Sequence, residues 1–381
     1  MSQHFALFDN NVDIDESGSL LLSQPVAFIE CVALDDVPQA FADMARYQSL
    51  GYFIAGYFAY EFAGYFNFDI KDNFGEPYFV LGVFKTCELL TDSQVDQFIA
   101  ELESGESAYI EDLQFGLNST EYQKAIKNIH RELIAGNSYQ VNYTFQTYCK
   151  LTGNSVDFYR KLRASQPVKY GAYLHFPNKT ILSRSPELFF KKQGAKLTVR
   201  PMKGTARRYL ADTAKDYASK NELKNDAKQV SENVMIVDLL RNDLGVIADA
   251  GSVSVDSLFE LETYPTVHQM VSEISCQIAR EMPLFQILQA LFPCGSVTGV
   301  PKKRTMEIIN RLEPSPRGVY TGAIGYLLPD NNMCFNVPIR TLELDRDNAG
   351  KMGIGSGVVL ESSAVAEFEE CWLKAQFLLA P

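Results

Sequence analysis

Residues 169–200, KYGAYLHFPNKTILSRSPELFFKKQGAKLTVR, are the stretch of the sequence that decides the fold. Short runs rich in β-branched and aromatic residues alternate there with turn residues, and such runs are typical of strands. They predict successive strands at 169–176, 180–183, 188–192 and 196–200. We therefore expect this part of the chain to assemble a sheet.

Helices and strands alternate irregularly around this stretch. Helical periodicity and end signals predict helices at 92–102, 121–135, 216–241, 283–291 and 302–312, with a last helix from 364 onward. Further strands are predicted at 139–148, 322–328, 334–344 and 352–360. The irregular order favours an α+β fold over a doubly wound parallel sheet.

The composition shifts near residue 110. Residues 51–68 combine many aromatic side chains with three glycines, which suits twisted strands and close backbone crossings. Ser104-Gly105-Glu106-Ser107 reads as a loop. We predict a short sheet-forming subdomain at 1–110 and a larger domain at 111–381.

Charge and hydropathy exclude two classes of partner. The 381 residues contain 35 Lys and Arg against 47 Asp and Glu, a net charge of −12 without a basic block, which argues against nucleic acid. The longest uncharged run, 283–301, is broken by Pro293 and Gly295 and is not expected to cross a membrane. With no signal peptide pattern at the N-terminus, we expect a cytoplasmic protein.

The seven cysteines and four histidines are scattered. No Cys-x-x-Cys or His-Glu-x-x-His spacing occurs, so neither a disulfide framework nor a zinc site is predicted. Any metal is expected to have oxygen ligands.

Two glycine-rich stretches allow more than one interpretation. Residues 353–357, GIGSG, could offer bare backbone amides to an anion, or could be a glycine-rich strand or bulge. Residues 295–302, GSVTGVPK, resemble a phosphate loop, but Pro301 stands where the Walker motif needs glycine, so that motif is rejected.

Charged residues on two predicted helices also have two interpretations. Glu367, Glu370 and Lys374 share one face of the last helix, and Glu232 lies on the helix at 216–241. They could form ordinary ion pairs at helix surfaces and ends, or two of the carboxylates could hold magnesium in one pocket. Lys203, in a predicted turn beside Gly204, is either a surface lysine or, if desolvated, a nucleophile.

Taken together, the motifs resemble the chorismate-utilising enzymes, and among them most closely the component I branch of the aminodeoxychorismate synthases. The resemblance covers residues 117–379, with a weaker echo at 56–66. The motifs that carry it are 136–142 (GNSYQVN), 183–187 (SRSPE), 201–205 (PMKGT), 232–244 (ENVMIVDLLRNDL), 295–299 (GSVTG), 340–342 (RTL) and 367–374 (EFEECWLK).

The resemblance implies a large, mostly antiparallel two-sheet core flanked by helices, with chorismate bound between the sheets. It implies Glu232 and Glu370 as magnesium ligands, and Glu187 as the general acid for loss of the C4 hydroxyl. The residues it implies for substrate binding are Gln140, Thr298, Tyr326, Arg340, Gly355 and Gly357. Of these, Arg340, Tyr326 and the two glycine amides match positions that grip the substrate's carboxylates.

Two positions divide this family by reaction. Its water-adding members carry a lysine base where this chain has Gln140, which indicates ammonia as the nucleophile. Lys203 matches the lysine of the aminodeoxychorismate enzymes, whereas anthranilate synthases usually carry alanine there. The implied mechanism is attack of Lys203 on C2 of chorismate, followed by ammonia at C4, giving 4-amino-4-deoxychorismate for 4-aminobenzoate and folate synthesis.

The sequence departs from the family pattern in two places. Gln269 stands where anthranilate synthases place a catalytic histidine, and His268, one residue earlier, is either its substitute or a hydrogen-bonded core histidine. The tryptophan-binding motif of those enzymes has only an approximate counterpart at 28–31, FIEC, so no tryptophan regulation is predicted.

The sequence contains no amidotransferase signature, which implies that a separate glutamine amidotransferase subunit supplies the ammonia. Two alternatives remain open: anthranilate synthase component I, which would release pyruvate, and a noncatalytic chorismate-binding protein, which would bind without turnover.

Overall fold

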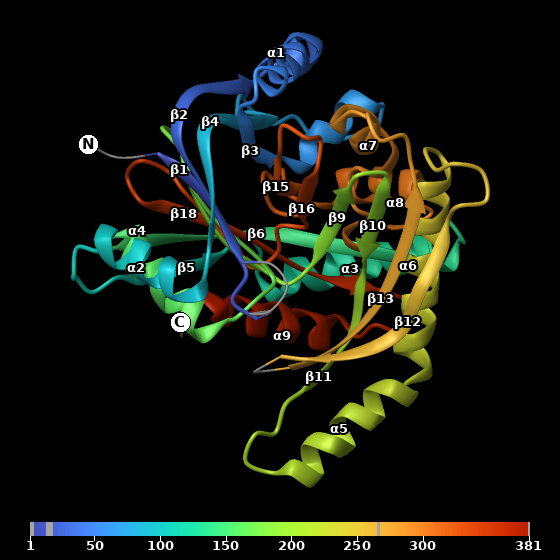
Figure 1. Cartoon of the computed structure of the whole chain (residues 1–381). Helices are drawn as coiled ribbons and strands as arrows, with labels where there is room; N and C mark the ends of the chain where they lie inside the picture. The colour runs from blue at the N-terminus through green and yellow to red at the C-terminus, as the bar shows by residue number, and fades with distance from the viewer. Residues whose placement is uncertain (1–3, 13–17, 265–266, 380–381) are drawn as a thin grey trace.

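The computed structural model describes residues 4–12, 18–264 and 267–379, whose arrangement is shown in Figure 1. Eighteen strands lie in these ranges. They are β1 (Phe5–Asp9), β2 (Ser19–Cys31), β3 (Phe53–Phe58), β4 (Phe79–Leu90), β5 (Tyr109–Phe115), β6 (Gln140–Thr152), β7 (Tyr170–His175), β8 (Thr180–Ser185), β9 (Leu188–Gln193), β10 (Lys196–Arg200), β11 (Met202–Arg207), β12 (Ser254–Thr263), β13 (Val267–Gln277), β14 (Gly299–Val300), β15 (Ala323–Leu327), β16 (Met333–Asn336), β17 (Thr341–Leu344) and β18 (Ala349–Val358).

Helices connect many of these strands. The α-helices in the described ranges are α1 (Val37–Ser49), α2 (Asp92–Leu102), α3 (Ser119–Ile134), α4 (Ser155–Ser165), α5 (Thr213–Asn225), α6 (Ala227–Gly245), α7 (Leu284–Leu291), α8 (Lys302–Leu312) and α9 (Ala364–Ala375). Four short 3-10 helices add η1 (Leu34–Asp36), η2 (Tyr60–Phe66), η3 (Gly295–Val297) and η4 (Gln376–Leu378). Figure 1 shows α5 projecting away from the other elements.

The strands pair in one continuous antiparallel order. It runs β5-β6-β18-β17-β8-β7-β1-β2-β4-β3-β15-β16-β9-β10-β13, with β11 and β12 both pairing with β13, and β14 with β6. Strands from distant parts of the chain thus become neighbours, as where β1 lies between β2 and β7. The two predicted sheets are therefore joined in a single ladder.

Three buried clusters hold this ladder and its helices together. The inner one gathers side chains of β1, β2 and β7 with those of β3 and β15. A second cluster lies under α1, α6 and α7, and a third under α2, α3, α4 and α9. Because the helices cover the outer faces of an antiparallel sheet, the predicted α+β class is confirmed.

The predicted helix at 216–241 is wrong as a single element. The chain breaks at Asp226, whose extended backbone (ψ 105°) ends α5 and whose carboxylate accepts hydrogen bonds from the Lys228 and Gln229 amides. An aspartate that caps amides in this way starts a new helix, which periodicity alone does not reveal. α6 therefore begins at Ala227, five residues before Glu232.

The strand predicted at 334–344 also divides. β16 ends at Asn336 and β17 begins at Thr341, and between them Pro338 offers no amide for a ladder and Arg340 has a positive φ of 50°. The turn predicted at 201–205, around Lys203, is instead largely part of strand β11 (Met202–Arg207), which pairs with β13. The aromatic segment after residue 51 is strand only to Phe58 and then becomes η2.

The predicted boundary near residue 110 does not separate two sheets. Within residues 1–110, β1 pairs with β7 and β3 pairs with β15, which both belong to the later segment. The division into domains at 1–110 and 111–381 stays a prediction. None of the described helices is long and apolar enough to cross a membrane.

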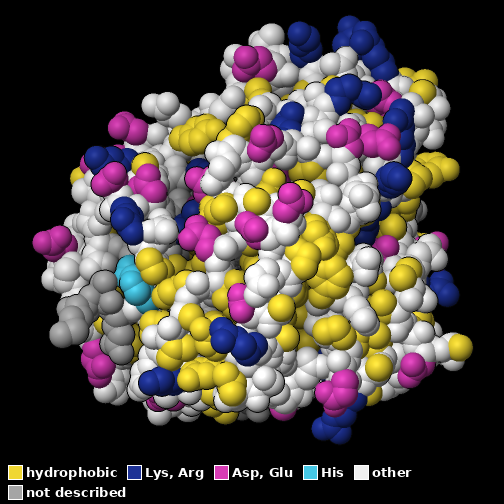
Figure 2. Space-filling view, turned by 90° about the horizontal axis from the view of Figure 1, so that it is seen from above, with side chains coloured by type: hydrophobic (Ala, Val, Ile, Leu, Met, Phe, Trp, Pro, Cys, Tyr) yellow, Lys and Arg dark blue, Asp and Glu magenta, His cyan; other side chains and the backbone are white. Residues whose placement is uncertain are grey.

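The molecular surface agrees with the charge pattern of the sequence. On the face seen in Figure 2, acidic and basic side chains are interspersed among apolar ones. Lys and Arg side chains gather toward the upper right rim of this face, where Asp and Glu side chains lie beside them.

Candidate active site

The site is built around the pairing of β6 with β18. Gly357 lies opposite Asn142 in this ladder, next to Gln140 at the start of β6. A Cβ on Gly357 would lie 2.6 Å from Gln140 Nε2 and 3.5 Å from Lys203 Nζ. The glycine therefore leaves open the space in which the Gln140 amide and the Lys203 ammonium approach β18.

Gln140 presents an unused acceptor in this space. Its side chain is 1% exposed, and its Oε1 has no hydrogen-bond partner among the described residues. A buried acceptor without a partner costs folding free energy, and this one is free to accept a hydrogen bond from a bound molecule.

Lys203 projects from β11 into a group of charges. Gly204, the next residue, has φ +98°, and a side chain there would press on Leu223 and Met270 at 3.2 Å, so glycine permits the local bend. Burial lowers the pKa of Lys203, while Glu232 and Glu187 oppose that change. A lysine of this kind is a better nucleophile than one in water, because more of it is neutral.

Glu187 lies between β8 and β9 and is 4% exposed. Ser296 Oγ donates a 2.6 Å hydrogen bond to Glu187 Oε1. Burial raises the pKa of Glu187 to about 7, against the opposing effects of Ser296 and the Lys203 charge. A carboxyl group with this pKa is suited to donate a proton near neutral pH.

Two helices bring carboxylates to the same region. α6 packs on β11 and carries Glu232, while α9 packs on β18 and carries Glu370. Burial raises the pKa of Glu232, and the charges of Glu367 and Glu370 add to the rise, whereas Lys203 and Lys228 oppose it. The carboxylates of α6 and α9 therefore act on one another electrostatically.

Glu370 also forms the ion pair that its spacing allows. Lys374 Nζ lies 2.6 Å from Glu370 Oε1 and donates a 2.8 Å hydrogen bond to the Gly355 carbonyl, which ties α9 to β18. Lys374 thus contacts both the Gly355 carbonyl and the Glu370 carboxylate.

The donor set fits magnesium. No group of three or more His, Cys, Asp or Glu side chains in the described ranges is placed to hold a metal ion by itself. Magnesium, however, is often bound through only one or two carboxylates, with water and substrate oxygens completing its shell. Glu232 and Glu370, whose charges act on one another, are the candidates for such a pair.

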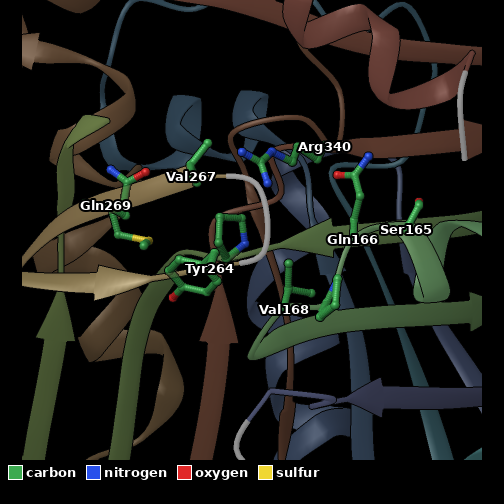
Figure 3. Close-up of a pocket in the computed structure, with 10 residues that line it drawn as sticks. Ser165, Gln166, Val168, Tyr264, Val267, Gln269 and Arg340 are labelled. Atoms are coloured by element: carbon green, nitrogen blue, oxygen red, sulfur yellow. The ribbon is translucent and has the colours of Figure 1, made fainter. Parts of the chain in front are cut away.

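Arg340 lines a narrow pocket of about 20 Å³. Met202, the residue before Lys203 in the chain, lines the same pocket. Figure 3 shows Tyr264, Val267 and Gln269 on one side of this pocket, Gln166 and Val168 on the other, and Arg340 between them. Burial lowers the pKa of Arg340, and no carboxylate is among the described groups that counteract it. An unpaired guanidinium is an anion-binding group.

The remaining predicted residues are less closely connected with Lys203. The Thr298 hydroxyl donates to the Gly295 carbonyl at 3.1 Å within its own turn, while the Thr298 carbonyl accepts from the Asn142 amide at 2.8 Å. Tyr326 on β15 packs edge-on against Phe8, with ring centroids 4.9 Å apart, and burial raises its pKa well above its usual range.

His268 is held apart from the Arg340 pocket. Its Nε2 lies 3.1 Å from Asp216 Oδ1 and its Nδ1 lies 3.1 Å from Thr263 Oγ1. The neighbouring Gln269 lines the pocket instead, and its Nε2 donates a 2.8 Å hydrogen bond to the Gly204 carbonyl. The structure thus joins Gln269, rather than His268, to the segment that carries Lys203, and a catalytic role of His268 stays a prediction.

Sequence reasoning missed the residues that support the site. Ser296 stands within a glycine-rich motif that does not indicate its partner, and Arg317 lies outside every motif of the sequence. Arg317 is 2% exposed and donates to the Val297 carbonyl at 2.8 Å and the Asn142 carbonyl at 2.7 Å. No local pattern marks these residues, because their partners lie far away in the sequence.

Comparison with known proteins supplies the family. The family model described as chorismate binding enzyme matches residues 13–380, almost the whole chain. The chain belongs to the chorismate-binding enzymes. Among curated relatives, it is 41% identical to the aminodeoxychorismate synthase of Streptomyces pristinaespiralis over 71% of this chain and 37% of that protein.

A second curated relative in this chorismate-binding enzyme family is aminodeoxychorismate synthase component 1 of Escherichia coli. It is 36% identical over 77% of this chain and 66% of that protein. The chain thus spans between about a third and two thirds of the length of these two relatives.

The fold is also shared with solved structures. Anthranilate synthase component I from Streptococcus pneumoniae superposes with a TM-score of 0.79 at 24% identity, covering 96% of this chain and 92% of that chain. The predicted chorismate-utilising enzyme fold is therefore confirmed.

Proposed function

We propose that this chorismate-binding enzyme is component I of an aminodeoxychorismate synthase, which converts chorismate and ammonia into 4-amino-4-deoxychorismate and water. The observation that carries the proposal is the placement of Lys203, a lysine of lowered pKa between Glu187 and Glu232, against the open face of Gly357. The names of the two curated relatives support the same reaction.

In the first step, neutral Lys203 Nζ attacks C2 of chorismate. The double bond shifts, the C4–O bond breaks, and protonated Glu187 gives its proton to the departing hydroxyl, which leaves as water. The pKa of about 7 for Glu187 supports this role, since a large fraction of the group carries a proton at neutral pH.

In the second step, ammonia attacks C4, the double bond shifts back, and the bond between C2 and the lysine nitrogen breaks. The lysine leaves as the neutral amine, and the ammonium group formed at C4 gives one proton to the Glu187 carboxylate, which restores Glu187 as the acid. Gln140 Oε1, the buried acceptor without a described partner, would accept a hydrogen bond from the incoming ammonia. Covalent catalysis of this kind divides one difficult substitution into two easier ones.

Groups around Lys203 would hold the substrate. Arg340 and the amides of Gly355 and Gly357 are suited to carboxylates. Glu232 and Glu370 would hold magnesium, which, when bound, neutralises the ring carboxylate of chorismate. Thr298, Tyr326 and His268 are retained as proposed site residues on the family resemblance.

The ammonia would come from a partner. The word component in the name of the Escherichia coli relative supports a second subunit, and we propose that this subunit is a glutamine amidotransferase. Neutral ammonia is scarce at pH 7, so its direct delivery by a partner increases the rate.

The test is to incubate the purified chain with chorismate, magnesium and ammonium at mildly alkaline pH and to identify the product by mass spectrometry. We expect aminodeoxychorismate, which keeps the enolpyruvyl group. Anthranilate with pyruvate would instead identify an anthranilate synthase, and binding without turnover would indicate a noncatalytic protein.

The Lys203→Ala variant extends this test. We expect its kcat to fall by at least about a hundredfold, because general acid–base catalysis and covalent catalysis each raise the rate by about that factor or more. Lys196→Ala is the matched control, since Lys196 is an exposed lysine on the neighbouring strand β10 and pairs with Asp256. Equal activity of both variants would remove Lys203 from the mechanism.

A further inference from the structure

The backbone of Glu187 is fixed from two sides. Its amide donates to Ser185 Oγ at 3.2 Å, and its carbonyl accepts from the Val337 amide at 3.0 Å. These contacts place the residue between the end of β8 and the end of β16. They fix the main chain, while the carboxyl group itself accepts hydrogen bonds from Ser296 and from the backbone amide of Met202 at the start of β11.

The carboxyl group is held by Ser296. This serine lies in η3, is 5% exposed, and donates the 2.6 Å hydrogen bond to Glu187 Oε1 across 109 positions of sequence. The other charged or titratable groups that act on Glu187 are Lys203, from β11, and Cys294 and Tyr320, which precede η3 and β15.

A neighbouring thiol gives Ser296 a second hydrogen-bond partner, and either atom of that contact can be the donor. Cys294 Sγ lies 3.2 Å from Ser296 Oγ, and burial raises the pKa of Cys294 to about 12, so the thiol keeps its hydrogen. The thiol can therefore donate to Ser296 Oγ, which leaves the Ser296 hydrogen for Glu187. In this arrangement Oε1 of Glu187 accepts the Ser296 hydrogen.

The turn that carries Ser296 is itself clamped. The Val297 carbonyl accepts from Arg317 Nη1 at 2.8 Å and from Asn142 Nδ2 at 3.1 Å. A side chain at Gly295 would press on Leu239 at 2.6 Å, so the turn packs closely on α6. The position of the Ser296 hydroxyl is thus preset by the fold rather than by the substrate.

We propose that Ser296 is a positioning residue that holds Oε1 of Glu187 as an acceptor, so that the acidic proton resides on Oε2. A protonated carboxyl group has one hydroxyl oxygen, and occupying the other oxygen with a donor decides which one carries the proton. The inference rests on the proposed function, because it assigns the orientation of the proposed general acid.

Two measurements test this proposal in the full chain. The first is steady-state kinetics of Ser296→Ala with chorismate, magnesium and ammonium. We expect kcat to fall about tenfold to a hundredfold, the range that a misplaced catalytic group costs, while KM for chorismate stays within about threefold. Ser296→Thr, which keeps the hydroxyl, should recover activity.

The second measurement is an infrared titration of the Glu187 carboxyl band, assigned by subtracting the spectrum of Glu187→Gln. It needs no turnover. Loss of a donor to Oε1 should move the carbonyl stretch to higher frequency and the titration midpoint to higher pH in Ser296→Ala.

Ser183→Ala is the matched control for both measurements. Ser183 is also fully buried and pairs through its hydroxyl, at 2.8 Å, with Thr341 on the neighbouring strand rather than with Glu187. We expect it to leave kcat and the carboxyl band as in the unmodified protein.

The outcomes separate the two proposals. An unchanged band and midpoint in Ser296→Ala, or equal changes in Ser183→Ala, would overturn the role of Ser296. Absence of turnover in the unmodified protein would overturn the proposed function alone, since the infrared titration would still report whether Ser296 holds the Glu187 carboxyl group.

Discussion

At the scale of single residues, the burial that makes Glu187 a suitable proton donor also lowers the stability of the folded protein above neutral pH. Burial raises its pKa from 4.5 to about 7, so the folded protein binds more protons than the unfolded chain between these values. Stability then decreases as pH rises through this window, by about 3 kcal/mol in total at 1.36 kcal/mol per pKa unit. A group kept ready to donate a proton thus weakens the fold above neutral pH.

Replacing this carboxyl group should therefore stabilise the folded protein and lower its catalytic activity. Glu187→Gln is neutral at every pH, so its melting temperature relative to the unmodified protein should rise between pH 5 and pH 8, as followed by circular dichroism. We expect its kcat to fall by about 10² to 10⁴, the usual contribution of a general acid.

Glu281→Gln provides the comparison, because Glu281 is exposed. It should change neither the pH dependence of melting nor the activity. A Glu187→Gln variant whose relative melting temperature is the same at pH 5 and pH 8 would contradict the raised pKa.

The residue types of the site could be predicted from the sequence, but their supports could not. Lys203, Glu187 and Glu232 each stand in a motif whose spacing is local, and the structure brings the three together. Ser296 lies 109 positions from Glu187, and Gln269 lies 65 positions from the carbonyl of Gly204 that it binds. Contacts over such separations are set by tertiary packing, which one sequence does not reveal.

At the scale of elements, the side chains of Gln140 and Lys203 approach β18 so closely that they limit which residue can occupy position 357. A Cβ at position 357 would meet the end of the Gln140 side chain at 2.6 Å and reach toward Lys203, whereas it would meet no backbone. A flexible side chain can move at small cost in stability, but its displacement alters the site.

Gly357→Ala should therefore lower kcat with ammonia by about tenfold or more while changing the free energy of unfolding by less than about 1 kcal/mol. Urea unfolding and steady-state kinetics measure the two effects. Gly245→Ala, at the end of α6 where a Cβ would have nothing within 4 Å, is the control for adding a methyl group. Unfolding of Gly357→Ala at much lower urea would show that the glycine is needed for the strand itself.

Elements with local signals were predicted well. α8 and α2 have the predicted bounds, because amphipathic periodicity marks both helices, while a capping box at Thr91 starts α2 and Pro301 immediately precedes α8. The break at Asp226 was missed since apolar spacing continues across it, and the break after Asn336 was missed because a positive φ at Arg340 leaves no trace in residue type. Residues 353–357 form part of strand β18, which is one of the two interpretations that the sequence allowed.

At the scale of the whole molecule, a buried ion cluster joins the first strand to the rest. Asp9 on β1 lies 2.6 Å from Arg184 Nη1 on β8 and 3.1 Å from Arg163 Nε on α4, and its carboxylate accepts from Tyr159 at 2.9 Å. Burial opposes ionisation of Asp9, but Arg184 and Arg163 outweigh it and lower its pKa. The stabilisation is therefore present above pH 3.8 and is lost as pH falls through the lowered pKa.

Removing one partner of this cluster should be costly. Asp9→Ala leaves Arg184 buried without its counter-ion, and we expect a loss of about 3 to 5 kcal/mol in urea unfolding at pH 7. Asp43→Ala, which breaks an exposed pair with Arg46 at 3.6 Å, should cost less than about 1 kcal/mol. Similar midpoints for the two variants would contradict a structural role of the cluster.

The pairing of β6 with β18 has a consequence for synthesis of the protein. Gln140 leaves the ribosome early, while the strand that carries Gly357 is translated about 200 residues later, which takes on the order of 10 s or more at typical elongation rates. Throughout that interval one edge of β6 is exposed and available to wrong partners or to chaperones. A nascent chain that has not reached Gly357 therefore has no partial activity, because the two sides of the site meet only after β18 has been synthesised.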